Sequence, residues 1–553
     1  MTETHIFPYD FIIGTLFRIA EQQKSNHERG KIVKILTARE AVELIKDNDT
    51  VALGGFGAYS APDELFAAVA DRFAETGHPM GLTCMTGISA GNFDKEHGVG
   101  LSRLKADGLM TTLIAGHIGN PPDVANLVGA NKIAGYILPL GVVMHLFRAM
   151  AGRQPGIISK VGLGTYADPR EEGCMGNDKA REQGREIVKL LNIDGEDYLF
   201  YKSVPLNVCL LRGTYADEDG NISIAHEALT EAQSQIAAAV HNNGGTVIFQ
   251  VEDIVARGSI PPREVRVHKS LVDVVVKASP ETQRQSYAVN EYHPELTGEI
   301  RVPVNAIAPM KMSLRKVIAR RGAMELKPGC VINLGIGIPS GVGSVANEEG
   351  IGDQMTLSLE SGPIGGVPVE GLGFGGSVNA DQIAPIPDTF DLYDGGFLDM
   401  TCLGAAEIDK EGNVNVSKFG TRCTGPGGFI NISQNTPKVC FMLGFTATKP
   451  ELAFEDGRLN IVKDGEGVKF VEKVQQITFS GAYARKTGQK VLYITERAVF
   501  ELREGGVTLT EIAPGADLEK DILAHMGFKP QIAEDLKEMD SRLFREGKMG
   551  LGK

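Results

Sequence analysis

The sequence has few cysteines, and they follow no regular spacing. Seven stand among 553 residues, scattered along the chain, odd in number and never arranged as CxxC. A disulfide framework or a zinc site needs cysteines at regular, close spacings, so neither is predicted. We interpret the seven as reduced thiols and expect a cytoplasmic protein with no bound metal.

An excess of basic residues and a long apolar run are also missing. The formal net charge is −14, which argues against a nucleic-acid partner, because such binding depends on Lys and Arg neutralising phosphates. The apolar run FIIGTLF (11–17) is too short to span a bilayer, and the N-terminus lacks the basic start and small-residue cleavage site of a signal peptide. We therefore expect no membrane partner and no export.

What is present is an ordinary globular composition, 42% hydrophobic and 23% charged. At this length the chain can form two or more domains, each with its own core. Helical patterns alternate with short apolar, β-rich runs from about Lys31 onward. This alternation predicts largely parallel sheets covered by helices.

Three segments of the chain each occur twice, in the same order, and this internal repeat is the most informative feature of the sequence. The pairs of similar segments are 47–62 with 327–339, 80–91 with 355–366, and 206–224 with 398–416. The spacing is 280 positions from Gly55 to Gly335, 275 from Met80 to Met355, and 192 from Leu206 to Leu398. The third pair has a strand–turn–strand hairpin pattern, which is common by itself. Three similar pairs in one order are not common, and they indicate two homologous halves.

The repeats divide the chain into consecutive regions. We predict an extension (1–30), an N-terminal domain (31–295), a linker (296–313), a C-terminal domain (314–535) and a tail (536–553). Because the spacing falls from 275 to 192 positions, the N-terminal domain should carry an insertion of about 83 residues.

An acid marks the second pair of segments. If the segments are superposed, 83–87 falls on 358–362 and Glu360 takes the place of Met85. A solvent-exposed loop glutamate without a function would be compatible with the same sequence. However, an apolar strand precedes Glu360 and the glycine-rich run SGPIGG follows it, and the carboxyl ends of parallel strands are where ligands bind. These features favour a functional carboxylate.

Such a carboxylate could bind a metal, act as a base or attack an acyl carbon. No nearby DxD or HxxxH pattern supports a metal, and a general base would leave the glycines unexplained. A carboxylate that attacks a thioester forms a negatively charged tetrahedral intermediate, which backbone N–H groups can stabilise where glycine lets the chain approach. The run GPGGF (425–429) could supply these donors, although a plain tight turn would give the same letters.

Two Gly-x-Gly loops also admit a nucleotide-binding interpretation. GGFGAY and LGIGIPSG each follow a strand, so their backbone could cradle phosphates. Neither matches G-x-G-x-x-G, so a dinucleotide site is disfavoured. A looser role against the pantetheine or diphosphate of coenzyme A (CoA) fits better.

These segments resemble the family I CoA-transferases, and specifically the fused single-chain acetate/propionate CoA-transferases. LESGPIGGVP resembles the active-site segment of that family, which identifies Glu360 as the glutamate that forms a glutamyl-CoA thioester. DNDTVALGGFGAYSAP resembles the first signature, with Ser60 where glycine is usual. The resemblance runs from about Lys31 to the C-terminus. It implies two homologous open α/β domains with mainly parallel sheets and the active site between them.

The resemblance also implies roles for further residues. Gly427 and Gly428 are expected to form the oxyanion loop. CoA should contact the loop made by Gly335, Ile336, Gly337, Ile338 and Pro339. The acyl pocket is expected to include Gly55, Phe56, Gly57 and Leu140.

The implied reaction is a ping-pong transfer of CoA between short-chain acids, with no cofactor beyond the CoA of the substrates. Acetate and propionate are expected substrates, and butyrate, lactate, acrylate or a 3-oxo acid are alternatives. We expect a homo-oligomer, a dimer or a tetramer. Two other functions stay open: an acyl-CoA hydrolase on the same scaffold, and a catalytically silent CoA-binding protein.

Leu140 is a departure from the family pattern. Relatives commonly carry Gln in the matching segment, where its amide is thought to help stabilise the oxyanion, and leucine cannot donate a hydrogen bond. Either backbone amides near Gly427 suffice and Leu140 shapes an apolar pocket, or transferase chemistry is impaired. We favour the first interpretation, because the glutamate and the glycine loops are present.

Overall fold

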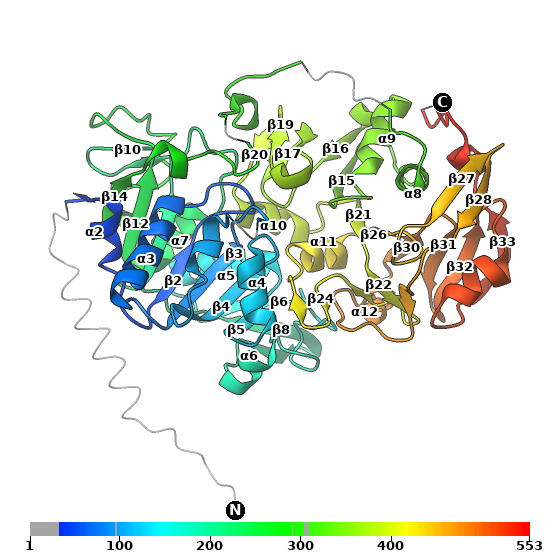
Figure 1. The fold of residues 1–553 in the computed structure, drawn as a ribbon, viewed down its shortest axis with the longest axis horizontal. Helices are drawn as coiled ribbons and strands as arrows, with labels where there is room; N and C mark the ends of the chain where they lie inside the picture. Colours follow the sequence, from blue (N-terminus) through cyan, green and yellow to red (C-terminus); the bar gives the residue numbers. More distant parts are fainter. Residues whose placement is uncertain (1–31, 95–96, 290, 304–308, 553) are drawn as a thin grey trace, which may run out of the picture.

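The computed structural model describes residues 32–94, 97–289, 291–303 and 309–552. The predicted extension (1–30) lies outside the described residues. Two large sheets lie side by side, one built from the blue-to-green half of the chain and the other from the green-to-red half (Figure 1).

The first sheet has eight strands, and all of its pairings are parallel. Its order is β1 (Lys34–Ile35), β14 (Val274–Lys277), β12 (Thr246–Val251), β9 (Val208–Arg212), β2 (Thr50–Leu53), β3 (Leu82–Ile88), β4 (Met110–His117), β5 (Ala134–Ile137). Every residue of β9 is buried, as expected for a central strand with helices on both faces.

The second sheet also has eight strands, and it is parallel over its first five. Its order is β16 (Met355–Leu357), β15 (Cys330–Leu334), β21 (Met400–Gly404), β26 (Lys438–Met442), β30 (Lys490–Ile494), β31 (Ala498–Arg503), β32 (Gly506–Ile512), β33 (Gln531–Glu538). The pairings β30–β31 and β31–β32 are antiparallel. The predicted fold class, α/β with mainly parallel sheets, is confirmed.

The repeat found in the sequence is visible in the strand order. The run β14-β12-β9-β2-β3 of the first sheet has the same connectivity as β30-β26-β21-β15-β16 of the second. Each half also has a small sheet: β11 (Ile222–Ser223), β10 (Tyr215–Asp217) and β13 (Asp253–Val255) in the first, β23 (Val414–Asn415), β22 (Glu407–Asp409) and β29 (Phe470–Val471) in the second. In both, the central strand pairs antiparallel with one neighbour and parallel with the other.

The hairpin turns of the third repeat are the same down to their hydrogen bonds. Asp217 accepts the backbone N–H of Asn221 at 2.9 Å and the side-chain amide of Asn221 at 2.9 Å. Asp409 does the same with Asn413, at 3.0 and 3.1 Å. The spacing of 192 positions from Asp217 to Asp409 is the one seen in the sequence, so it gives a fixed reference for the register.

The register corrects the superposition of Glu360 on Met85. Val51 pairs with Val208 and with Cys84. Ile332 pairs with Met400, 192 positions after Val208, and with Leu357. Cys84 therefore corresponds to Leu357, and the counterpart of Glu360 is Gly87. The sequence comparison slipped by two positions because both strands are short and apolar and their glycine-rich loops differ in length.

The helices pack in layers on the two sheets. They are α2 (Ala38–Val42), α3 (Asp63–Thr76), α4 (Pro122–Gly129), α5 (Leu140–Ala151), α6 (Asp178–Gln183), α7 (Gln233–Asn242), α8 (Leu314–Ala323), α9 (Gly341–Glu349), α10 (Ile386–Asp394), α11 (Phe429–Asn435) and α12 (Gly481–Thr487). One core joins α2, α3 and α4 to the first sheet, and another joins α8 and α9 to the second. A third core contains residues of α5 and α7 from the first half and of α10 and α11 from the second. The two halves thus share a continuous apolar core, and its helices α10 and α11 lie near the centre of Figure 1.

The inserted segment of the first half contains a separate antiparallel sheet. Its strand order is β6 (Gly156–Ser159), β8 (Glu196–Lys202), β7 (Val188–Ile193). This sheet lies below the junction of the two halves in Figure 1. The segment between the second and third repeats also contains β4 and β5, which extend the main sheet beyond β3.

The C-terminal segment is held by charged side chains. Strand β33 extends to Glu538, beyond the expected domain boundary at 535. The Arg320 guanidinium donates to the carbonyl oxygens of Leu543 and Arg545. Glu349 accepts the backbone N–H groups of Met549 (2.6 Å), Gly550 (2.7 Å) and Leu551 (3.1 Å). The segment 539–552 is therefore docked on α8 and α9.

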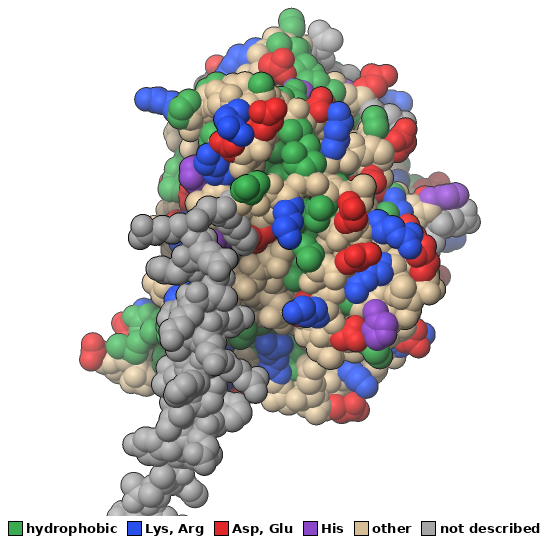
Figure 2. All heavy atoms as spheres, turned by 90° about the vertical axis from the view of Figure 1, so that its left-hand side faces the viewer, with side chains coloured by type: hydrophobic (Ala, Val, Ile, Leu, Met, Phe, Trp, Pro, Cys, Tyr) green, Lys and Arg blue, Asp and Glu red, His purple; other side chains and the backbone are tan. Residues whose placement is uncertain are grey.

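Surface features agree with the composition. On the face shown in Figure 2, Lys and Arg side chains are interspersed with Asp and Glu. Within the described residues, no helix has the length and apolarity needed to cross a membrane. All seven cysteines lie in the described residues, where they are buried and unbridged.

Candidate active site

Glu360 lies in the turn that follows β16, the strand at one end of the second sheet. The turn is closed by the Leu359 N–H, which donates to the Pro363 carbonyl at 2.9 Å. Gly362 has a φ of 122°, and a Cβ there would collide with the Ala384 carbonyl oxygen, so only glycine fits. The Glu360 side chain is half-buried at the carboxyl end of the strand.

Gly427 and Gly428 meet Glu360 at the start of α11. The Gly428 N–H donates to the Glu360 carboxylate, and a Cβ on Gly428 would collide with Glu360 Oε2. Gly427 has a φ of 53°, in the left-handed region that glycine adopts readily. Burial raises the pKa of Glu360 to about 7, although the Gly428 hydrogen bond opposes this shift.

The first half orients the peptide group that contacts Glu360. The Leu140 N–H, at the start of α5, donates to the Gly427 carbonyl at 3.0 Å. The C=O and N–H of a trans peptide point in opposite directions. With its C=O directed at Leu140, the 427–428 peptide directs its N–H toward Glu360.

The Leu140 side chain packs against two glycines of the first sheet. Its Cδ1 lies 3.1 Å from the position of a Cβ on Gly87, and its Cβ lies 3.2 Å from that of a Cβ on Gly116. Leu140 is fully buried. What it brings to the Glu360 loop is therefore its backbone N–H, while its side chain packs in the core beneath α5.

The first glycine loop lies beside the Glu360 turn. The Phe56 ring is 3.3 Å from the position of a Cβ on Gly375, and Ser361 Cβ is 3.6 Å from the same position. The Ser361 hydroxyl donates to the Gly375 carbonyl at 2.6 Å. Gly55, with a φ of 109°, donates its N–H to Glu231 Oε2 at 2.9 Å. The expected acyl-pocket loop (55–57) and the Glu360 turn are thus brought together from opposite halves.

The second glycine loop (335–339) follows β15, the strand next to β16. Its residue Ile336 is 61% exposed, and a Cβ on Gly337 would meet nothing within 4 Å. Arg315 of α8 donates to the Ser340 hydroxyl at 2.8 Å and pairs with Glu370 at 3.3 Å. The loop expected to bind CoA therefore lies open to solvent near Glu360, with a cation beside it.

A buried polar group beneath Glu360 was missed by sequence reasoning. The Ser358 and Tyr393 hydroxyls lie 2.8 Å apart, and the Asn333 amide donates to the Ser358 carbonyl at 2.9 Å. Burial raises the Tyr393 pKa far above its ordinary value, and the nearby Glu360 charge raises it further. The spacing of these residues gives no motif; only the sheet brings them together.

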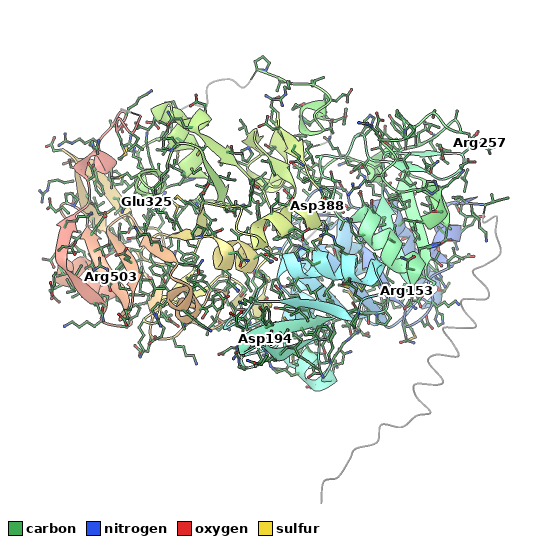
Figure 3. The ribbon with its side chains drawn as sticks, turned by 180° about the vertical axis from the view of Figure 1, so that it is seen from behind. Arg153, Asp194, Arg257, Glu325, Asp388 and Arg503 are labelled. Carbon is green, nitrogen blue, oxygen red and sulfur yellow. The ribbon has the colours of Figure 1, made fainter. Side chains whose placement is uncertain are left out.

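The junction between the halves is also bridged by charge. Arg148 of α5 pairs with Asp388 of α10 at 2.5 Å and also with Asp391. Asp388 appears near the middle of the molecule in Figure 3, where the two halves meet. Glu360, the Gly427–Gly428 peptide, Leu140 and Phe56 therefore converge at an interface that core packing, hydrogen bonds and ion pairs all stabilise.

Comparisons with known proteins follow this geometry. A family model described as coenzyme A transferase matches residues 35–278. A caffeate CoA-transferase of Acetobacterium woodii is 46% identical, over 94% of this chain and 99% of that protein. Acetate CoA-transferase YdiF of Escherichia coli K12 is 40% identical, over 94% of this chain and 96% of that protein.

Solved structures agree with the sequence relatives. The apoenzyme of the acyl-CoA transferase YdiF from Escherichia coli O157:H7 superposes with a TM-score of 0.88 at 39% identity, covering 94% of this chain and 98% of that one. A thioester complex of that protein with CoA gives a TM-score of 0.87 at the same identity and coverage. The likeness extends over both halves and the junction between them.

Proposed function

Because the chain belongs to the coenzyme A transferase family, we propose that it transfers CoA between carboxylic acids through a thioester on Glu360. One observation carries this proposal: the Glu360 carboxylate lies at the junction of the halves against the Gly428 backbone, whose N–H is directed toward it. The thioester complex of the related YdiF protein supports the same type of intermediate.

The proposed steps balance in atoms and charge. A Glu360 carboxylate oxygen attacks the carbonyl carbon of the acyl-CoA, the C–S bond breaks and CoA leaves as the thiolate, which produces an acyl-glutamyl anhydride. The thiolate then attacks Cδ of Glu360 and the acyl group leaves as a carboxylate, which produces glutamyl-CoA. The acceptor carboxylate reverses both steps, so no proton or electron is gained or lost.

The backbone donor has a defined task in these steps. Each attack places negative charge on an oxygen, and attack on Cδ places it on an oxygen of Glu360 itself. The Gly428 N–H already points at that carboxylate, so it can donate to the same oxygen in the intermediate. The donor is held in place before the reaction, because the Leu140 N–H fixes the peptide that carries it.

The other expected residues fit this scheme. The exposed loop 335–339 would hold the pantetheine or the diphosphate of CoA, and Arg315 would supply a positive charge for a phosphate. Phe56, which like Ser361 lies close to Gly375, would form one wall of the acyl pocket. We retain acetate and propionate as the proposed substrates and add hydroxycinnamates as a second candidate, which the 46% identical caffeate CoA-transferase favours.

Trapping the intermediate tests the mechanism. The protein is incubated with acetyl-CoA or propionyl-CoA without acceptor, and its peptides are mapped by mass spectrometry. We expect CoA on Glu360 and none on the Glu360→Gln variant. An adduct on another residue, or none in the wild type, would contradict the mechanism.

A donor and acceptor panel tests the substrate class. We expect turnover with acetate, propionate and butyrate as acceptors to exceed turnover with caffeate and cinnamate. The reverse order would assign the chain to hydroxycinnamate activation. CoA release at an equal rate with and without acceptor would instead identify a hydrolase.

A further inference from the structure

The two halves cap each other's helices in matching ways. Helix α5 begins after Pro139 and α10 begins after Pro385, and neither proline provides a side-chain cap. The Leu140 N–H donates to the Gly427 carbonyl of the second half at 3.0 Å. The Ile386 N–H donates to the Glu231 carbonyl of the first half at 3.2 Å. Each half therefore satisfies a free N–H at a helix start in the other.

Helix α5 receives a second cap that contacts no reacting atom. The Gly141 N–H donates to Asn431 Oδ1 of α11 at 3.1 Å. Asn431 is fully buried, and a Cβ on Gly141 would collide with its side-chain amide, so the contact is close. Consecutive amides at the start of α5 thus bind the carbonyl of Gly427 and the side chain of Asn431, which are four positions apart in the second half.

Asp394 fixes the orientation of the Asn431 side chain. Asn431 Nδ2 donates to both carboxylate oxygens of Asp394, at 2.9 and 3.2 Å, which leaves Oδ1 directed at Gly141. Asn435, one turn further along α11, also donates to Asp394 at 3.1 Å but does not bridge to the first half in this way.

The charged and titratable groups that face Asp394 come from three elements. His145 Nδ1 of α5 lies 3.8 Å away and lowers the pKa of Asp394, whereas Asp391 of α10 raises it. Tyr201 of β8 also senses the Asp394 charge. Burial outweighs the other effects and raises the pKa of Asp394 to about 6.

We propose that Asn431, held by Asp394, is a positioning residue that sets the oxyanion donor of Gly428 by anchoring the start of α5. The link is short: Asn431 holds Gly141, the adjacent Leu140 N–H holds the Gly427 carbonyl, and that peptide directs the Gly428 N–H at Glu360. This inference rests on the proposed function, because it assigns the pathway that positions the donor used there.

Loss of the anchor should affect turnover more than binding. If Asn431 cannot accept from Gly141, the start of α5 moves and the Gly428 N–H loses its alignment with the developing negative charge. Removal of a whole oxyanion donor lowers turnover by about 10²- to 10³-fold. Misalignment should cost less, so we expect Asn431→Leu to lower kcat by about 10- to 100-fold, with KM for acyl-CoA within about threefold of wild type.

A reciprocal exchange provides the sharpest test. Asn431→Asp places two carboxylates in contact, so its kcat relative to wild type at the same pH should be low at pH 8 and rise toward pH 6, where the pair binds one proton. In the double variant Asn431→Asp with Asp394→Asn, the aspartate still accepts from Gly141 and the new asparagine donates to it. This variant should restore kcat to within about threefold of wild type across that pH range.

The control variant is Asn435→Ser. It removes a hydrogen bond to Asp394 from the same helix but leaves the contact with Gly141 intact, so kcat should stay within about threefold of wild type. The inference is overturned if Asn431→Leu keeps wild-type kcat, if kcat and KM change together with the melting temperature, or if the double variant does not recover. Because the wild type is assayed for the Glu360 adduct in parallel, failure of the proposed function is seen separately as absence of that adduct.

Discussion

In the first half, the position three residues beyond Cys84 on β3 is Gly87; in the second half, the matching position, in the turn after the edge strand β16, is Glu360. A Cβ on Gly87 would collide with the Met144 side chain of α5. Among the described residues, no strand pairs with the outer edge of β16, so the matching position can carry a long side chain. The acid thus lies at the edge of the second sheet, at a position where the first sheet continues with β4.

Before helices α7 and α11 the two halves differ in the opposite sense, with an acid in the first half and a glycine in the second. Glu231 and Gly427 each lie two residues before a helix, with φ values of 48° and 53°. Glycine adopts this conformation freely, whereas for glutamate it carries strain. Glu231 is buried, and its Oε1 has no hydrogen-bond partner among the described residues. Burial, with the charge of Glu227 adding to it, raises its pKa to about 8.

Each half therefore holds a carboxylate with a raised pKa next to the N–H of a glycine, but at a different position. In the first half the acid accepts the N–H of Gly55, and in the second it accepts the N–H of Gly428. We infer that Glu231 holds a loop, whereas Glu360 performs the chemistry. The following predictions test this difference, from the largest expected effect to the smallest.

Removal of the Glu360 carboxylate should abolish the reaction. Glu360→Ala should lower turnover by about 10⁴-fold or more, as expected when a nucleophile is deleted. The matching position is already glycine, so the fold does not require the acid, and the melting temperature should stay within a few degrees of wild type. Residual activity within about tenfold of wild type would show that another group is the nucleophile.

Turnover should be nearly as sensitive to substitution of Gly428, whose N–H is the proposed oxyanion donor. Gly428 has a φ of −79°, which alanine adopts without strain, and its counterpart in the first half is Ala232. Gly428→Ala should therefore act mainly through the collision with Glu360, with a further tight contact at Phe390, and lower kcat by about 10²- to 10³-fold. Steady-state kinetics and a melting curve test this together; a large loss of stability with little effect on kcat would contradict it.

The pH dependence should reveal the raised pKa of Glu360. The carboxylate is the nucleophile and its pKa is about 7, so the rate of adduct formation should rise with pH through 7 and level off above 8. Single-turnover rates between pH 5.5 and 9 measure this directly. A rate that is already level at pH 5.5 would place the pKa near its ordinary value.

The two acids should differ most clearly when each is made neutral. An acid whose pKa is raised on folding binds more protons in the folded state, so it lowers stability as pH rises above its unfolded value. Glu231→Gln should therefore raise the melting temperature at pH 9 by about 2–4 °C and have little effect at pH 5. Its turnover at pH 7 should stay within about threefold of wild type, in contrast to Glu360→Gln. A loss comparable to that of Glu360→Gln would make Glu231 a second essential acid.

Much of this architecture could be predicted because an internal repeat can be detected in the sequence without a structure. The paired hairpins at Asp217 and Asp409, the two glycine loops and the exceptional acid in SGPIGG can be recognised without coordinates. The superposition of Glu360 on Met85 failed because a short apolar strand can slide by two residues with little change in its pattern. Only pairing with neighbouring strands fixes the register.

The sequence by itself determined the α/β class, the two homologous halves and the candidate acid, since periodicity, glycine loops and an internal repeat are local features of the chain. Only the tertiary structure decided that β16 is the edge strand of its sheet, that the Leu140 N–H donates to the Gly427 carbonyl, and that Asn431 accepts from the start of α5. These facts depend on contacts between residues as much as 290 positions apart. Such contacts form when two apolar faces pack together, and no local pattern encodes which backbone groups then meet.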